Sequence, residues 1–216
     1  MKKLNSEYVE RVNLLVNNSP YFSLLSMKIL DVGIGYSHLE IDIDQKHLQP
    51  FGLVHGGVFA SIIDAAAFWS VYYDVEDQNS GVTTVDIKLN YLAPAVSGKL
   101  VARGRQIKLG KILGYAEAEV ANEDGKILAH GTSTVMIQPG RGLTDDPPLP
   151  QKFIDESNSR ILKKSLSVRC NKNPLPLQGG DMWDMQAEFF SIILCNACLF
   201  SGGRHFLINE SLDLIA

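Results

Sequence analysis

The stretch that decides the fold is Gln49-Pro-Phe-Gly-Leu-Val-His-Gly-Gly-Val-Phe-Ala-Ser-Ile-Ile-Asp64, which reads as a turn leading directly into a helix. Residues 58–73 contain neither Pro nor Gly, and at about 100° per residue their large apolar side chains fall on one side. The members of this side, which we expect to be buried, are Phe59, Ile62, Ala66, Trp69 and Tyr73. The members of the opposite side are Gly57, Ala60, Asp64 and Phe68. A carboxylate therefore lies at mid-helix among mostly small neighbours, with room for a ligand to approach.

Two features of this stretch suggest chemistry. A buried carboxylate such as Asp64 is costly unless it is paired or has a function. The backbone N–H groups of His55-Gly56-Gly57 lie where the helix begins, so they lack intrahelical partners and point outward at the positive end of the helix dipole. Such a helix start suits a developing oxyanion.

The sequence Gln49-Pro-Phe-Gly-Leu-Val-His-Gly-Gly followed by Asp64 resembles the hotdog-fold acyl-CoA thioesterases of the phenylacetate-type and hydroxybenzoyl-CoA branches. The resemblance covers residues 27–137 and includes Thr84-Val-Asp-Ile-Lys-Leu-Asn-Tyr-Leu-Ala-Pro, Gly98-Lys-Leu-Val-Ala-Arg-Gly-Arg and Leu109-Gly-Lys. It implies an α+β fold in which about six antiparallel strands wrap one long helix. It also implies hydrolysis of acyl-CoA without a metal or dissociable cofactor, in dimers or dimers of dimers.

The resemblance assigns a role to each catalytic candidate. Asp64 is the expected base or nucleophile, and the N–H of Gly56 is expected to hold the thioester oxygen. Gln49 and His55 resemble the polar pair that orients the thioester and the helix start. Thr84 falls where the family often carries a hydroxyl that positions water near the carboxylate.

Four further residues are expected to contact substrate. Gly57 and Phe68 lie on the open side of the helix, while Gly110 and Lys111 resemble the family's loop near the CoA nucleotide. Phe68 departs from the hydroxybenzoyl-CoA branch, which carries a small hydroxylated residue one turn after the carboxylate. We expect this ring to narrow or reshape the acyl pocket.

Each of these residues also has a purely structural interpretation. Asp64 could cap a helix or pair with a partner chain, and Gly56 could simply permit a tight turn. His55 could be a loop histidine that binds backbone, Thr84 a β-forming residue, and Lys111 an exposed hairpin lysine.

The rest of the chain predicts a small α+β domain. Residues 4–16 have helical spacing with Pro20 as a stop, and residues 27–32 and 36–42 read as a hairpin. After the helix, the segments 82–91, 99–109, 112–122 and 127–137 read as strands. Their short connections predict an antiparallel meander.

The composition changes after the last predicted strand. We expect a thioesterase domain over residues 1–138, a Pro-rich linker over 139–151 and an extension of unknown structure over 152–216. All the candidate site residues precede the linker, so the extension is expected to be dispensable for chemistry. It contains all three cysteines, for which packing as small apolar side chains is favoured over metal binding or redox chemistry.

Composition excludes several classes of function. A net charge of −4 without a basic stripe gives no reason to expect nucleic acid as a partner. The first 25 residues lack the apolar core of a signal peptide, and the 12-residue apolar run 189–200 is shorter than a membrane span, so we expect a cytoplasmic protein.

Three functions are compatible with these features: an acyl-CoA thioesterase, a non-catalytic acyl-CoA-binding hotdog module, and a dehydratase of hydroxyacyl thioesters. Asp64 favours the first over the second. The sequence context of the carboxylate and the histidine disfavours the third.

Overall fold

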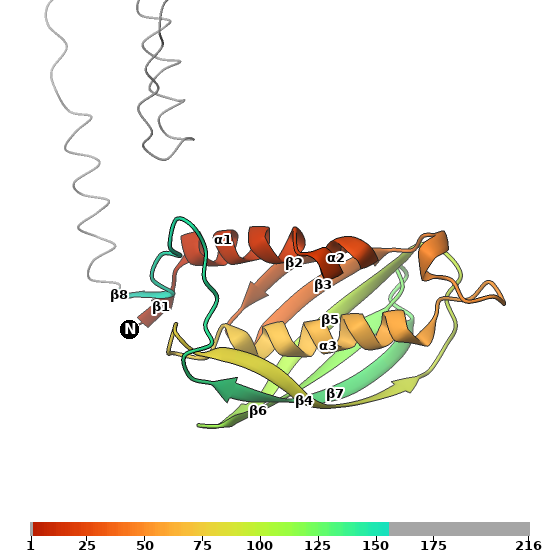
Figure 1. Cartoon of the computed structure of the whole chain (residues 1–216). Helices are drawn as coiled ribbons and strands as arrows, with labels where there is room; N and C mark the ends of the chain where they lie inside the picture. Colours follow the sequence, from red (N-terminus) through yellow and green to blue (C-terminus); the bar gives the residue numbers. More distant parts are fainter. Residues whose placement is uncertain (1, 156–216) are drawn as a thin grey trace, which may run out of the picture. The chain divides into compact units, whose positions relative to one another are not determined.

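The computed structural model describes residues 2–155, in which a six-stranded antiparallel sheet curls around one long helix, α3 (Figure 1). In chain order the elements are β1 (Lys2–Leu4), α1 (Ser6–Asn17), α2 (Pro20–Leu25), β2 (Met27–Gly33), β3 (Tyr36–Asp42), a 3₁₀ turn (Gln45–His47), α3 (Gly56–Tyr72), β4 (Gly81–Tyr91), β5 (Lys99–Leu109), β6 (Leu113–Ala121), β7 (Ile127–Gln138) and β8 (Phe153–Asp155). The expected α+β hotdog architecture is confirmed.

The strand order in the sheet is β2-β3-β5-β6-β7-β4. The predicted meander is correct for β5, β6 and β7 but wrong for β4, which pairs with β7 instead of β5. The connection over residues 92–98 is too long to enforce a hairpin, and it runs beside the loop that precedes α3, where the N–H of Val54 donates to the carbonyl oxygen of Ala95 at 2.8 Å. This route carries the chain from the β4 edge of the sheet to its centre and closes one side of a pocket.

Helix α3 buries the side predicted from its periodicity. All five residues assigned to that side are at most 7% exposed, whereas Asp64 and Phe68 on the other side are half-buried. Strand β5 approaches the helix so closely that a Cβ on Gly104 would collide with the carbonyl group of Ala66. The hydroxyl of Ser37 on β3 donates to that same carbonyl at 2.6 Å. These contacts fix the buried face of α3 on the sheet.

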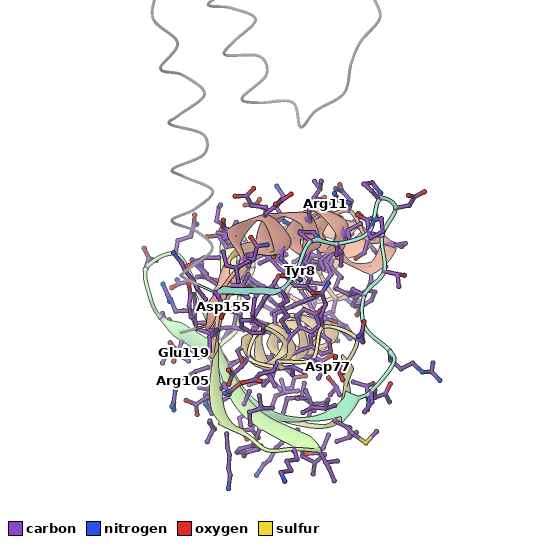
Figure 2. The ribbon with its side chains drawn as sticks, turned by 90° about the vertical axis from the view of Figure 1, so that its left-hand side faces the viewer. Tyr8, Arg11, Asp77, Arg105, Glu119 and Asp155 are labelled. Atoms are coloured by element: carbon purple, nitrogen blue, oxygen red, sulfur yellow. The ribbon has the colours of Figure 1, made fainter. Side chains whose placement is uncertain are left out.

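The two N-terminal helices cover α3 on the side away from the sheet. The expected lead-in helix is confirmed as α1, but Pro20 opens the further helix α2 instead of only ending the first. Viewed end-on, α3 lies between the sheet and α1, with Tyr8 of α1 pointing toward it (Figure 2). The hydroxyl groups of Tyr8 and Tyr72 are 2.7 Å apart in this buried layer.

Residues 142–155, which we call the strap, pack against this domain although their Pro-rich composition predicted a linker up to residue 151. The N–H of Gly142 donates to the carbonyl of Asn79 at 2.8 Å, and Asp145 forms an ion pair with Arg11 of α1. Strand β8 at the end of the strap pairs antiparallel with β1. The strap therefore holds the N-terminal helix and the end of α3 together, as its course in Figure 1 shows. The domain division itself stays a prediction.

Other expectations concern residues outside the described range, namely the extension beyond residue 155, its apolar run 189–200 and the three cysteines. Within residues 2–155, no helix combines the length and the apolar character needed to cross a bilayer.

Candidate active site

The start of α3 is held by a local hydrogen bond from its own N-cap. His55 has extended backbone dihedrals, and its Nδ1 accepts from the N–H of Gly57 at 2.9 Å. Because Nδ1 accepts, the neutral ring carries its proton on Nε2 and keeps one donor for a ligand. Nδ1 of His55 therefore binds backbone, as the structural interpretation of this residue expected, and Nε2 remains available to a ligand.

This cap leaves Gly56 as the free donor of the helix start. Among the described residues the N–H of Gly56 has no hydrogen-bond partner, whereas the N–H of Gly57 is satisfied by His55. The carbonyl of Gly56 accepts from the hydroxyl of Tyr91 at 3.1 Å, which orients the Gly56–Gly57 peptide at the helix start. A Cβ on Gly56 would approach that hydroxyl to 2.8 Å, so the close fit favours glycine.

Gln49 stands in the turn that precedes the helix. Its side-chain oxygen accepts from the N–H of Phe51 at 2.8 Å, and its own N–H donates to the carbonyl of Leu53 at 2.8 Å. The side-chain amide nitrogen has no partner among the described residues and remains a possible donor.

Gln49, His55 and Gly56 line one pocket of about 590 Å³. The other residues around it are Leu53, Val54, Gly57, Phe59, Tyr91, Leu92, Ala93 and Pro94. Three donors and an apolar wall in one concave site are typical of a ligand-binding pocket. The sequence did not single out Tyr91, although its position as the last residue of the predicted strand 82–91 placed it beside the predicted turn.

Asp64 lies two turns further along α3, on the half-buried side. The hydroxyl of Thr84 on β4 donates to Asp64 Oδ1 at 2.7 Å. Burial raises the pKa of the Asp64 carboxyl above its usual value, and the Thr84 hydrogen bond acts in the opposite direction. The carboxylate is therefore oriented by one donor and keeps Oδ2 for another partner, as a general base requires.

A smaller apolar pocket of about 290 Å³ begins one turn beyond Asp64. Phe68 follows Asp64 by one helical turn, and Val82 precedes Thr84 by two residues on the same strand, so both lie on the sides that carry the carboxylate and its donor. The residues around this pocket are Leu15, Val16, Ser19, Phe22, Phe68, Trp69, Tyr72, Gly81, Val82, Arg141 and Leu143. Phe68 also stacks on Tyr72 with an interplanar angle of 9°.

The structure separates the remaining candidates from both pockets. Gly110 and Lys111 form the hairpin between β5 and β6, where Lys111 is exposed and the N–H of Gly110 donates to the carbonyl of Leu113 at 2.8 Å. Neither residue lines the pocket at the helix start or the pocket beside Phe68.

Within one chain the candidate groups fall into two sets. The donors Gln49, His55 and Gly56 share the pocket at the helix start, whereas Asp64 and Thr84 lie outside its lining. Among residues 2–155, no group of three or more histidine, cysteine or acidic side chains could hold a metal ion.

The sequence did not predict a pair of hydroxyl groups, from Tyr21 and Ser61, on the open side of α3. The hydroxyl groups of Tyr21 on α2 and Ser61 on α3 are 2.6 Å apart, and Ser61 Oγ donates to the carbonyl of Gly57 at 2.8 Å. The helical spacing of Ser61 and Asp64 could have indicated a shared face, but nothing in the sequence predicts that α2 brings Tyr21 there.

The fold and this arrangement of a helix-start donor and a mid-helix carboxylate define a protein of the hotdog thioesterase class, and comparison with known proteins agrees. The model of the thioesterase superfamily matches residues 51–129. A thioesterase from Haemophilus influenzae is 26% identical, with a TM-score of 0.57 over 63% of this chain and 93% of that one. An X-ray structure of a thioesterase superfamily protein is 30% identical, with a TM-score of 0.55 over 62% of this chain and 100% of that one.

Relatives with more specific names are also similar to this chain. The 1,4-dihydroxy-2-naphthoyl-CoA hydrolase of Listeria monocytogenes is 26% identical over 54% of this chain and 94% of that protein. Human acyl-coenzyme A thioesterase 13 is 26% identical over 44% of this chain and 68% of that protein. The chain belongs to the thioesterase superfamily, whose members hydrolyse thioesters.

Proposed function

We propose that this protein hydrolyses acyl-CoA thioesters to a free acid and CoA, with Asp64 as the reacting carboxylate and the N–H of Gly56 as the oxyanion donor. The observation that carries this proposal is the hydrogen bond from Thr84 to Asp64 Oδ1, because it holds a half-buried carboxylate ready on the open face of the helix that begins with a free N–H. The names of two relatives, a naphthoyl-CoA hydrolase and an acyl-coenzyme A thioesterase, support CoA thioesters as substrates.

In the proposed reaction, Asp64 takes a proton from water while the water oxygen bonds to the thioester carbon. The developing oxyanion accepts a hydrogen bond from Gly56, with Gln49 and His55 as further donors in the same pocket. Collapse of the tetrahedral intermediate breaks the carbon–sulfur bond, and the thiolate of CoA takes up the proton from Asp64. Direct attack by Asp64 to form an anhydride is the alternative, and single turnover in labelled water distinguishes the two by whether label enters the carboxylate of Asp64.

Helix geometry favours a site shared between two chains. Gly56 and Asp64 are eight residues apart in the sequence, which is about 12 Å along a helix axis at 1.5 Å per residue. A thioester carbonyl must lie about 3 Å from its oxyanion donor and within similar reach of its attacking group. Two antiparallel α3 helices around a two-fold axis would bring Asp64 of one chain near Gly56 of the other. The proposed enzyme is therefore a homodimer or a dimer of dimers.

The pocket beside Phe68 supports an apolar acyl group. It begins one helical turn beyond Asp64, and most of its wall consists of aromatic and aliphatic side chains from α1, α2, α3 and β4. Such a pocket suits aryl or medium-length acyl groups, whose burial releases water from apolar surface. The CoA nucleotide would lie outside it, where Lys111 on its exposed hairpin is a candidate contact.

The deciding experiment is incubation of the purified protein with a panel of aryl- and medium acyl-CoAs and a thiol-detecting dye. We expect release of free CoA, and we expect Asp64→Asn to lower kcat by about 10²–10⁴-fold while the fold is retained. Binding of acyl-CoA without release of thiol would instead identify a binding module, and dehydration of a hydroxyacyl-CoA would identify a dehydratase. Near-full activity of Asp64→Asn would refute the assignment of Asp64.

A further inference from the structure

The hydroxyl pair of Tyr21 and Ser61 lies on the same face of α3 as Asp64. Ser61 precedes Asp64 by three residues, so their Cβ atoms are separated by about 5–6 Å. Long helical side chains lean toward the helix N-terminus, which carries the Asp64 carboxylate over the turn that contains Ser61. Ser61 and Asp64 are both partly exposed, and Tyr21 is 54% exposed.

The direction of the hydrogen bonds in this pair follows from its partners. Ser61 Oγ donates its one proton to the carbonyl of Gly57, so the proton between the two hydroxyl groups belongs to Tyr21. Ser61 Oγ then accepts from Tyr21 and keeps one free lone pair. Together the two oxygens present acceptors, and no donor, to a molecule on this face.

A water that attacks the thioester needs two acceptors. Asp64 uses Oδ1 for the Thr84 hydroxyl, which leaves Oδ2 to accept the proton that is removed during attack. The second hydrogen of the water must also be accepted by a group near the carboxylate, or the oxygen lone pair is not directed at the carbon. A Cβ separation of about 5–6 Å between Ser61 and Asp64 leaves room for one water between the two side chains.

We infer that Ser61, held by Tyr21, is a positioning residue that accepts the second hydrogen of the nucleophilic water beside Asp64. This inference rests on the proposed thioesterase function and adds to it a role for α2, an element outside the matched family region. In the step, the water gives one proton to Asp64 and keeps the other bound to Ser61. Its oxygen bonds to the thioester carbon, and the CoA thiolate leaves.

The test compares Ser61→Ala, Ser61→Thr and Tyr21→Phe in the full-length protein, with CoA release measured over a range of acyl-CoA concentrations. We expect Ser61→Ala to lower kcat by about 10- to 100-fold with KM little changed, since it misplaces the water and leaves the substrate contacts intact. Ser61→Thr should restore most of the loss because it keeps the hydroxyl. Tyr21→Phe should lower kcat in the same direction but by less.

The same helix offers a matched control. Ser70 Oγ donates to the carbonyl of Ala67 at 2.7 Å, just as Ser61 Oγ donates to the carbonyl of a residue in its own preceding turn. Ser70 differs from Ser61 because it is buried and lies away from Asp64. Ser70→Ala tests the loss of a helix hydroxyl, and Tyr36→Phe tests the loss of an exposed tyrosine hydroxyl on β3. Melting temperatures of all variants report folding.

Each result has one meaning. An active wild type with full kcat in Ser61→Ala would overturn the inference, as would equal losses in Ser61→Ala and Ser70→Ala or no rescue by Ser61→Thr. If Ser61→Ala does not fold, the comparison of Ser61→Thr with Tyr21→Phe decides: full kcat in Tyr21→Phe overturns the inference. A wild type that releases no CoA would overturn the proposed function itself, which the wild-type assay reveals before any variant is compared.

Discussion

Lys152 Nζ donates a hydrogen bond to the carbonyl oxygen of Tyr72 at 2.6 Å, at the C-terminal end of α3. The same ammonium donates to the carbonyl of Val75 at 2.7 Å and lies 4.3 Å from the centroid of the Tyr72 ring. The last carbonyls of a helix lack intrahelical donors and lie at the negative end of the helix dipole. The ammonium of Lys152 supplies the missing donor and a positive charge at this end. A side chain of the strap thereby completes the helix that carries Asp64.

We expect Lys152→Met to lower the free energy of unfolding by about 1–3 kcal/mol at pH 7, because the last carbonyl of α3 and the carbonyl of Val75 just beyond it lose their buried donor. Chemical denaturation of the wild type and the variant measures this difference. Lys99 is a matched control because it pairs with Glu40 on the surface of the sheet, where an ion pair contributes little. Equal stability of the wild type and Lys152→Met would contradict the role of Lys152 as a helix cap.

The pH dependence of the same comparison has a defined sign. Burial lowers the pKa of Lys152 to about 8 from 10.5, and Asp74 and Asp77 act in the opposite direction. Between these two values the unfolded chain binds more protons than the folded one, so raising the pH favours the folded state. The wild type should therefore gain stability relative to Lys152→Met from pH 8 to pH 10, and a difference that stays flat or shrinks would show that burial does not lower the pKa of Lys152.

Truncation tests where the dispensable part of the chain begins. The sequence predicted that the chain beyond Gly140 is dispensable for chemistry, but the strap supplies Lys152 and the β8 strand that pairs with β1. We expect a chain ending at Asp155 to keep the melting temperature and the activity of the full protein, and a chain ending at Gly140 to lose stability. Thermal unfolding with thiol release checks both, and equal stability of the two truncated chains would show that the strap is a passive segment.

The Thr84 hydrogen bond predicts a shift in the pH profile of activity. This bond lowers the pKa of Asp64, against the rise caused by burial. Removing it with Thr84→Val should raise that pKa, so the acid limb of kcat/KM, where Asp64 loses its charge as the pH falls, should move to higher pH. Thr84→Ser keeps the donor and should leave the limb in place, and an unchanged limb in Thr84→Val would separate Asp64 from the titration that governs activity.

Phe68 provides a prediction about the acyl group. Its ring forms one wall of the pocket of about 290 Å³, so Phe68→Ala should enlarge the pocket and shift preference toward bulkier acyl groups. Ratios of kcat/KM across a series of acyl-CoAs measure the shift. A ratio that does not change between short and bulky substrates would place the acyl group elsewhere.

Particular residues show which parts of the fold and the site the sequence could predict. The helical period identified the buried side of α3, and the strand patterns located the six strands of the larger sheet to within about one residue at each end, because both signals are local. The short strands β1 and β8 were not predicted. The place of β4 beside β7 was missed, since a seven-residue connection leaves its partner open. The contacts of Lys152 and Tyr21 were also missed because they join segments far apart in the chain, on which periodicity carries no information.

The composite site leads to a mixing experiment. If the site is shared, a chain with Asp64→Asn and a chain with Gln49→Ala and His55→Ala should each be inactive, since every site in either homodimer lacks one required set. In a heterodimer, Asp64 of the second chain meets Gln49, His55 and Gly56 of the first, so one of the two sites is wholly wild type. With free exchange of equal amounts, about half of the dimers are mixed and activity should recover to about a quarter of the wild-type value. Verified exchange of subunits without recovery would mean that each site is built within one chain, and the pairing of Asp64 with Gly56 across a two-fold axis would then be wrong.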